Sequence, residues 1–577
     1  MNKLLSVARG DCPADIVIKN AKIANVYTKE YELNDVAIYD DKIAGVGKNY
    51  DGKIIFNAEG AVLIPGMIDG HIHIEDTMLT PPAFAHAVAK LGTSAVMADP
   101  HEISNALGIS GLEYMYKSGL NLPIDIFWGA PSCVPASKFE TPFEELDMLD
   151  IKKMFDKNLA QHLGEVMNYP ALISGDPDIW GKITAAGNVP LTGHAPEVTG
   201  KNLNAYLISG ISSDHECNTL EEAREKLRRG MWIMIREGAS FPNLKILLPL
   251  IFENELNAAR CMIVSDDITA RYLLETGHMD AKMRIMLREG LNPFTALRMV
   301  TLSPAEYFRL WDRGGIAPGK LADFSILDSD EIDESFKIKH VWKNGKAIVL
   351  DEDVFTKNIN EHLAPAMRTI IKNIPTSEQI KIKFDEHKNN LINVIGVTEG
   401  TVLTKTLKIS PTLDKNNYVV ADSSRDVSKI VVLERHRDTG NFGKGFVSGL
   451  GIMRGAIGSS VAHDAHNFVV AGADDESIIT ALKCLSEMGG GLVISDGNKI
   501  IRSFALPIGG LMSYLDVDNV AVELTKMELS AEGLGIKIKH PFMVLSFLCL
   551  SVIPELRITD QGYININNGG IQNIFVQ

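Results

Sequence analysis

The sequence predicts an α/β protein built on a (β/α)8 TIM-type barrel, with a small flanking β domain and an additional C-terminal α+β domain. Three observations support this fold class. Short apolar runs alternate with helix-like segments between residues 61 and 310, period-two alternation flanks that region, and a glycine-rich region begins at about residue 396. At 577 residues the chain is too long for a single core, which also favours several domains.

Eight apolar runs are the expected barrel strands. Each run ends in Gly, Pro or a polar cluster, and its spacing from the next run suits a βα unit. The alternative, an open doubly wound sheet, would need a glycine-rich phosphate loop after its first strand, and the sequence has none there. The runs are Met67–His73, Thr93–Pro100, Ile124–Ala130, Gln161–Met167, Val189–Ala195, Ile211–Glu216, Met231–Glu237 and Cys261–Asp267.

The regions outside the barrel divide the rest of the chain. Residues 15–60 alternate with period two, and Lys343-Asn344-Gly345-Lys346 is a hairpin-turn signal, so 1–60 and 311–350 are expected to form one small β-sandwich-like domain. Residues 61–310 would form the barrel. A polar, Lys/Asn-rich stretch at 351–395 is expected to be a linker, and 396–577 a C-terminal domain.

Composition narrows the class of protein. The net charge of −16 argues against nucleic-acid binding, which needs clustered lysine and arginine. No uncharged apolar stretch reaches the length of a membrane span, and the N-terminus lacks the apolar core of a signal peptide. The six cysteines are scattered without a CxxC motif, so we expect a cytoplasmic protein, and the extra domain favours a homodimer.

Metal-ligand side chains gather where the expected strands end, which is the end of a barrel that carries the active site. In an extended strand, His71 and His73 lie on one face and offer two nitrogens to one ion. Each such residue, taken singly, also has a structural explanation. Ser265-Asp266-Asp267, for example, is typical of a helix N-cap. Imidazoles and carboxylates together suit Zn, Mn or Fe(II), and a carboxylate can bridge two ions. The converging residues are His71, His73, Glu165, His194, His215 and Asp266.

This order of ligands resembles the amidohydrolase superfamily. Many members use a carboxylated lysine on the fourth strand, where this chain has Glu165. The whole chain resembles the bacterial adenine deaminase family, which implies hydrolysis of adenine to hypoxanthine and ammonia by a metal-bridged hydroxide. The resemblance also implies two metal ions per chain, Mn²⁺ first, with Fe²⁺ or Zn²⁺ as alternatives. The matching segments are Pro65–Glu75, Asp99–Ile103, Gly164–Met167, Gly193–Pro196, Asp214–Glu216, Arg236–Gly238, Ser265–Asp267 and Ser459–Asn467.

The resemblance also implies roles for individual residues. His71 and His73 would hold the first metal, Glu165 would bridge, and His194 and His215 would hold the second.

Catalytic roles are expected for Asp266, Glu237 and Glu165. Asp266 would touch the first metal and move protons. Glu237 is the first candidate to protonate N1 of the base, with a salt bridge to Arg236 or to a neighbouring loop as the structural alternative. Residues expected to lie behind the ligands or against the substrate are Asp99, His101, Glu102, His463 and His466.

Other functions remain open at this level. A cyclic-amide hydrolase of the dihydroorotase or hydantoinase kind would use the same metals, but its usual strand-four lysine is missing. Other nucleobase deaminases commonly use one metal and would not need Glu165. A catalytically dead scaffold barrel would be expected to have lost ligands, and none is missing.

Overall fold

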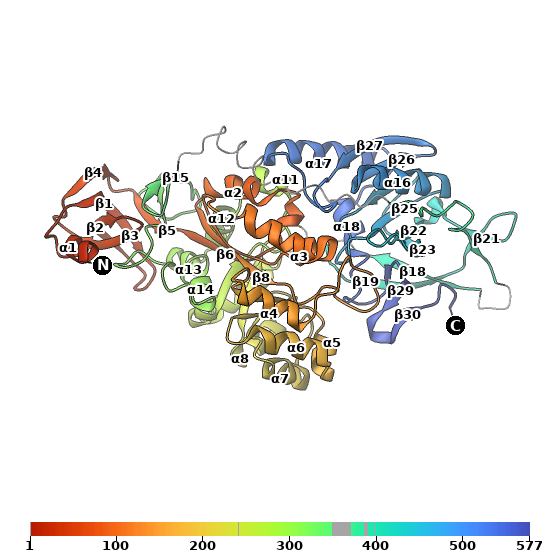
Figure 1. Cartoon of the computed structure of the whole chain (residues 1–577), viewed down its shortest axis with the longest axis horizontal. Coiled ribbons are helices and arrows are strands. Elements are labelled where there is room, and N and C mark those ends of the chain that lie inside the picture. The colour runs from red at the N-terminus through yellow and green to blue at the C-terminus, as the bar shows by residue number, and fades with distance from the viewer. Residues whose placement is uncertain (1, 240–241, 349–370, 386–389, 399, 577) are drawn as a thin grey trace.

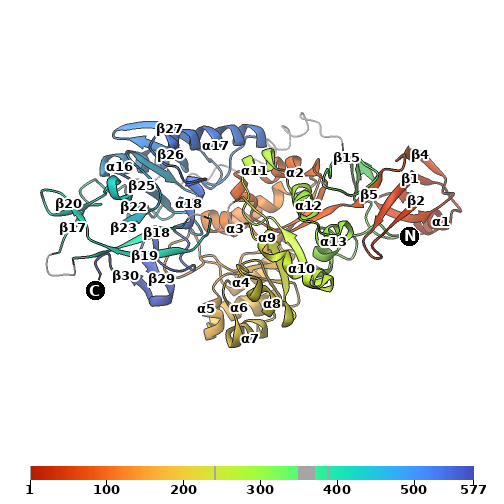
Figure 2. The ribbon, with the colours of Figure 1, turned by 180° about the vertical axis from the view of Figure 1, so that it is seen from behind.

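The computed structural model describes residues 2–239, 242–348, 371–385, 390–398 and 400–576. Three parts follow one another along the long axis: an N-terminal sheet, a central α/β region and a C-terminal region (Figure 1). The same order is seen from behind, with the helices of the central region between two β-rich ends (Figure 2).

The N-terminal sheet joins two stretches that are far apart in the chain. β5 (Val62–Pro65) pairs antiparallel with β14 (Phe324–Leu327), and Phe324 stacks on Trp342 with ring centroids 5.5 Å apart. This pairing anchors both ends of the central region, because β6 directly follows β5. The chain begins with α1 (Asn2–Ala8), and the remaining strands are β1 (Ala14–Asn25), β2 (Glu30–Tyr39), β3 (Lys42–Gly47), β4 (Gly52–Asn57), β15 (Ile338–Lys343) and β16 (Lys346–Ala347).

Each of the eight expected strand regions in the centre contains one strand of a parallel array. Five strands form the sheet β10-β9-β8-β7-β6, and three form β11-β12-β13. A parallel bridge between Ile72 and Asp266 sets β13 beside β6. At the other seam Gly193 packs against β11, and a Cβ there would lie 2.3 Å from the Ser213 carbonyl oxygen, so only glycine fits. The strands are β6 (Met67–Ile72), β7 (Thr93–Ala98), β8 (Asp125–Ala130), β9 (His162–Val166), β10 (Leu191–Gly193), β11 (Ser213–Asp214), β12 (Trp232–Arg236) and β13 (Cys261–Val264).

Helices connect these strands and cover their outer faces. Amphipathic segments such as α12, which buries Met279, Met283 and Met286, form the apolar layer against the strands. The helices are α2 (Pro81–Ala89), α3 (His101–Ser118), α4 (Met148–Asp156), α5 (Tyr169–Ser174), α6 (Pro177–Ala186), α7 (Gly200–Ile208), α8 (Leu220–Arg228), α9 (Leu244–Leu247), α10 (Pro249–Glu253), α11 (Ala270–Glu275), α12 (Met279–Arg288), α13 (Pro293–Met299) and α14 (Leu302–Tyr307). Short 3-10 turns are η1 (Ile74–Thr77) and η2 (Glu255–Arg260).

The C-terminal region is built on an eight-stranded sheet in the order β19-β18-β23-β22-β25-β24-β26-β27. Its strands are β18 (Ile392–Val397), β19 (Thr404–Ile409), β22 (Val427–Leu433), β23 (Phe442–Ser448), β24 (Ala456–Ser459), β25 (Phe468–Gly472), β26 (Gly491–Asp496) and β27 (Lys499–Ala505). Its helices are α16 (Asp475–Met488), α17 (Val517–Glu532) and α18 (Pro541–Phe547), with 3-10 turns η3 (Ser423–Arg425) and η4 (Ile566–Asn568). Smaller sheets contain β17 (Ile382–Lys383), β20 (Thr412–Leu413) and β21 (Tyr418–Val420), and β28 (Arg557–Thr559), β29 (Gly562–Asn565) and β30 (Gly570–Gln572).

The expected linker at 351–395 lies partly outside the described residues, and its described part is structured. It contains β17 and the first residues of β18. Ile371 and Ile380 are buried in the core of the C-terminal region. Packing against a distant sheet overrides the polar composition that suggested a linker.

One apolar core joins the C-terminal region to the centre. Phe84 of α2 and Ile103 of α3 belong to the same buried cluster as Ile430 and Leu492 of the large sheet. The backbone N–H of Ser513 donates to the carbonyl of Met78 at 2.9 Å. This packing brings the loop between β24 and β25 to the carboxyl ends of the central strands. Among the described residues, no helix has the length and apolar character of a membrane span.

Candidate active site

The structure brings all six expected ligands together at the carboxyl ends of the central strands. His71 is in β6 and Glu165 in β9. His73, His194 and His215 directly follow β6, β10 and β11, and Asp266 lies two residues after the end of β13. The N–H of Asp266 donates to the carbonyl of His71 at 2.9 Å, which fixes the two neighbouring strand ends in register.

Glu165 lies between two groups of ligand atoms. Its Oε1 is 3.2 Å from His73 Nε2 and 4.0 Å from His71 Nε2. Its Oε2 is 2.8 Å from His194 Nδ1 and 3.1 Å from His215 Nε2. The two carboxylate oxygens therefore face two different histidine pairs, as a bridging ligand requires.

Asp266 completes the first group. Its Oδ1 lies 3.3 Å from the Nε2 atoms of both His71 and His73. His73 Nδ1 contacts the carbonyl oxygen of Asp99 at 3.0 Å, and a carbonyl can only accept, so Nδ1 carries the proton and Nε2 is free to bind a metal. His71 Nε2 and His194 Nε2 are buried without a hydrogen-bond partner among the described residues. This set of donors fits divalent metal ions.

Carboxylates and imidazoles in this site shift one another's pKa values. Burial alone would raise the pKa of the Glu165 carboxyl, but the imidazoles of His215 and His194 hold it well below its ordinary value. Burial would likewise lower the pKa of His215, yet the charges of Glu165 and Asp266 raise it to about 9. Cations at the histidine nitrogens would replace these protons, which is the usual coupling between proton release and metal binding.

Arg236 connects the first group to a further carboxylate. One of its nitrogens, Nη1, donates to Asp266 Oδ2 at 2.8 Å and also to Glu216 Oε1. Glu216 Oε2 is buried without a hydrogen-bond partner in the described structure. Arg236 thus holds Asp266 from behind and leaves one oxygen of Glu216 available to a ligand in the cavity.

Glu237, the expected proton donor to N1, does not line the cavity. Its carboxylate accepts from the backbone N–H of Leu244 and lies near Lys282. Successive side chains of a strand point to opposite faces, so Arg236 at the end of β12 points into the site and Glu237 points away. The structure therefore places Glu237, the expected proton donor to N1, outside the residues that line the cavity, whereas Arg236 lines it.

Asp99 and His101, expected behind the ligands, lie close to Glu165. Asp99 Oδ2 accepts from the backbone N–H of Glu165 at 2.7 Å, so Asp99 positions Glu165 as well as His73. His101 Nδ1 lies 3.4 Å from Asp99 Oδ1 and 3.8 Å from Glu165 Oε1.

Glu102 extends this group toward the C-terminal region. Its carboxylate contacts His463 Nδ1 at 2.7 Å and also His466 Nε2.

The C-terminal region closes one side of the cavity. His463 and Asp464 reach it from the loop after β24, and Phe547, Leu550 and Ile553 provide an apolar wall. The cavity is lined by His73, His101, Glu102, Glu165, Met167, His194, His215, Glu216, Arg236, Asp266, Asp267, Val402, His463, Asp464, Phe547, Leu550 and Ile553. Glu216 and Arg236 lie at the ends of two expected strands, so the sequence predicts their positions but not their roles. No sequence signal identifies the apolar wall.

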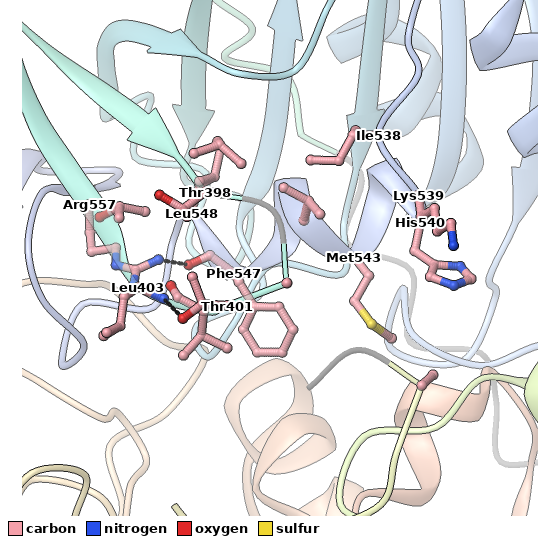
Figure 3. A pocket seen from close by; sticks show the side chains of 16 residues that line it. Thr398, Thr401, Leu403, Ile538, Lys539, His540, Met543, Phe547, Leu548 and Arg557 are labelled. Carbon is pink, nitrogen blue, oxygen red and sulfur yellow. Dashed lines mark hydrogen bonds between the residues drawn. The ribbon is translucent and has the colours of Figure 1, made fainter. Parts of the chain in front are cut away.

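A second cavity of about 380 Å³ adjoins this wall (Figure 3). Val402 and Phe547 line both cavities. Between them the buried guanidinium of Arg557 donates to the carbonyl oxygens of Phe547 at 2.8 Å and of Ile553 at 3.0 Å. It also donates to the carbonyl of Val402 at 2.5 Å. Arg557 therefore holds two residues of the wall, Phe547 and Ile553, and the adjoining Val402 by their backbones.

Comparison with known proteins gives matches along the whole chain. Residues 62–348 match the amidohydrolase family model, and residues 401–569 match the model of the adenine deaminase C-terminal domain. An adenine deaminase of Desulfatibacillum aliphaticivorans is 41% identical over 577 residues, covering 100% of this chain and 99% of that protein. An adenine deaminase of Thermosipho africanus is 39% identical over 586 aligned residues, covering 100% and 99%. Among solved structures, a variant of atrazine chlorohydrolase TrzN from Arthrobacter aurescens matches 60% of this chain and 99% of its own, with a TM-score of 0.47 and 14% identity.

Proposed function

The chain belongs to the adenine deaminases of the amidohydrolase family, and on that premise we propose how its residues hydrolyse adenine to hypoxanthine and ammonia. The observation that carries the proposal is the position of Glu165, whose two oxygens face two separate groups of metal-ligand atoms. The full-length relatives do not favour the alternative of a cyclic-amide hydrolase.

The proposed ligands of one divalent ion are His71, His73 and Asp266, and those of the other are His194 and His215, with Glu165 shared. When bound, the two ions would polarise water so that it attacks near neutral pH. We assign Mn²⁺, with Fe²⁺ and Zn²⁺ as alternatives, because all three accept nitrogen and oxygen ligands.

Asp266 is proposed to move the first proton. It accepts a proton from the attacking water as the new bond to C6 forms, and it later gives that proton to the departing amino nitrogen. Burial would raise its pKa, but the charge of His215, the hydrogen bonds from His71 and His73 and the charge of Arg236 hold the pKa well below its ordinary value. An ionised carboxylate at this place is ready to accept a proton at neutral pH.

Asp267 is proposed to protonate N1 in place of Glu237. It lines the cavity, and burial followed by the charge of Asp266 raises its pKa, so it keeps a proton more readily than an ordinary aspartate. It gives this proton to N1 when the water attacks. When the bond from C6 to the amino nitrogen breaks, the second water proton returns to Asp267 and ammonia leaves.

Recognition of the base is assigned to Glu216 and the apolar wall. The unpartnered Oε2 of Glu216 can accept a ring N–H of adenine, and Phe547, Leu550 and Ile553 can pack against the purine. Because the wall belongs to the C-terminal region, both halves of the chain would be needed for turnover.

The finer architecture is also a proposal. The eight parallel strands would close into one (β/α)8 barrel at 61–310, supported by the bridge between Ile72 and Asp266 and by the close approach of Gly193 to β11. Residues 1–60 with 311–350 would form the small β domain, and 396–577 the C-terminal domain.

The cellular setting is proposed from the cysteines. All six cysteines are unpaired, which fits a reducing cytoplasm. We also propose that the chain forms a homodimer. Light scattering of the purified chain would detect it, and a monomer at micromolar concentration would contradict it.

Turnover of a substrate panel tests the function. Mn²⁺-loaded protein is incubated with adenine, adenosine, guanine, cytosine and dihydroorotate, and ammonia and ring opening are measured beside a metal-stripped control. The proposal expects ammonia and hypoxanthine from adenine alone. Ring opening of dihydroorotate without deamination of adenine would overturn it.

A further inference from the structure

A second group of ligand atoms lies beside Glu165, where the C-terminal region meets the strand ends. α3 contributes His101 and Glu102, and the loop after β24 contributes His463 and Asp464. Their exposed fractions are only 1–4%, so water does not solvate them freely. None of these four residues is among the six ligands assigned to the two-metal centre.

The separations within this group suit a single cation. Glu102 Oε1 lies 3.2 Å from His101 Nε2 and 2.7 Å from His463 Nδ1. Asp464 Oδ1 lies 3.9 and 3.8 Å from the same two nitrogens. Four ligands placed about 2.1 Å from an ion in tetrahedral geometry lie about 3.4 Å from one another. The observed distances fall on both sides of that value, so small side-chain rotations would complete the set.

Neighbouring groups orient these ligands as they do around bound metals. His466 Nδ1 accepts the backbone N–H of Ala462 at 3.1 Å, so its Nε2 carries the proton and donates to Glu102 Oε2. This contact leaves Glu102 Oε1 facing His101 and His463. On the other side, the second nitrogen of His101 faces the Asp99 carboxylate at 3.4 Å, an arrangement typical of metal-binding histidines.

One carboxylate oxygen of this group is available to a cation. Asp464 Oδ2 is buried and has no hydrogen-bond partner among the described residues. A further carboxylate, Asp76, lies 3.8 Å from the far nitrogen of His463. Buried carboxylate oxygens are rarely left without a donor, a water or an ion, and here acidic groups accumulate around imidazoles.

We propose that His101, Glu102, His463 and Asp464 bind a third divalent cation, of the class of Mn²⁺, Fe²⁺ or Zn²⁺ that nitrogen and oxygen ligands accept. The ion would tie the C-terminal region to α3 next to the two-metal centre. It would hold His463, whose ring stacks on Phe547 of the apolar wall with centroids 4.6 Å apart.

Counting bound metal tests this inference. Full-length protein is stripped of metal and titrated with Mn²⁺, and bound manganese is measured by elemental analysis after free ion is removed. We expect three Mn²⁺ per chain in the wild type, two in Asp464→Asn and in Glu102→Gln, and three in the control Glu237→Gln. Two ions per chain in saturated wild type, or three in folded Asp464→Asn, would overturn the inference.

Anomalous scattering from Mn²⁺-soaked wild-type crystals makes the test independent of any variant. A peak between His101 and His463 supports the third site, and its absence beside two peaks at Glu165 refutes it. The Glu165→Gln variant separates this inference from the proposed function. It should lose the paired peaks and keep the third, whereas active wild-type protein with only two peaks would retain the function and refute the third site.

Discussion

The substitution Glu165→Gln removes the charge that is shared by the two proposed metal positions. The amide has nearly the same shape, so the four histidines that surround the side chain keep their packing. Two unit charges 4 Å apart interact by about 4 kcal/mol at an effective dielectric constant of about 20. Half of the carboxylate charge faces each doubly charged ion, so each position loses roughly that amount. A loss of about 1.4 kcal/mol raises the dissociation constant tenfold. The amide oxygen recovers part of the lost interaction. We therefore expect about 100- to 1,000-fold weaker Mn²⁺ binding.

The assay is a Mn²⁺ titration of stripped protein, followed by elemental analysis and adenine turnover on the same samples. Circular dichroism confirms that the variant is folded. Glu237→Gln is the matched control, because Glu237 directly follows the central strand β12 but does not line the cavity. The control should bind metal and turn over adenine as the wild type does. Wild-type affinity and turnover in Glu165→Gln would refute the bridging assignment.

Three further predictions address proton transfer, the apolar wall and pH. Asp266→Asn should retain most bound Mn²⁺ and lower kcat by about 10²- to 10⁴-fold, measured by ammonia release, because the amide cannot accept the water proton. Arg557→Met should raise KM for adenine about tenfold while metal content stays unchanged, because the wall loses its backbone clamp; an unchanged KM would contradict that role. Burial lowers the pKa of His162 to about 4, against an ordinary value of 6.5, so the unfolded state binds the proton first as pH falls. Metal-free protein should therefore lose about 3 kcal/mol of unfolding free energy between pH 6.5 and 4 from this group, and urea titrations of His162→Gln should show a shallower loss.

The part of the site at the ends of the central strands follows from local sequence patterns. An apolar run that ends at His71, His194 or His215 places the last side chain at the carboxyl end of a strand, and parallel neighbours bring such ends together. Glu165 and Asp266 follow from the same rule. This rule does not depend on packing between distant parts of the chain. It therefore brings all five of these residues together in the structure.

The side-chain direction at a strand end is less predictable. Arg236 and Glu237 are consecutive, and alternation allows only one of them to point inward. The sequence contains two charged residues there and no marker of which parity the strand adopts. Packing of β12 between β11 and β13 decides the parity, and it turns the arginine toward Asp266.

The C-terminal half of the site depends on contacts that span more than 300 residues, so no local pattern reveals it. Adenine presents two apolar ring faces, whereas the strand ends offer almost only imidazoles and carboxylates. The wall formed by Phe547, Leu550 and Ile553 supplies the missing apolar surface. Such a wall can discriminate only if it is held at a fixed distance from the metals, and Arg557 holds its backbone on one side while His463 packs on its ring at the other. The last region of the chain is therefore expected to determine the affinity for adenine, while Glu165 and the other proposed metal ligands are expected to determine the chemistry.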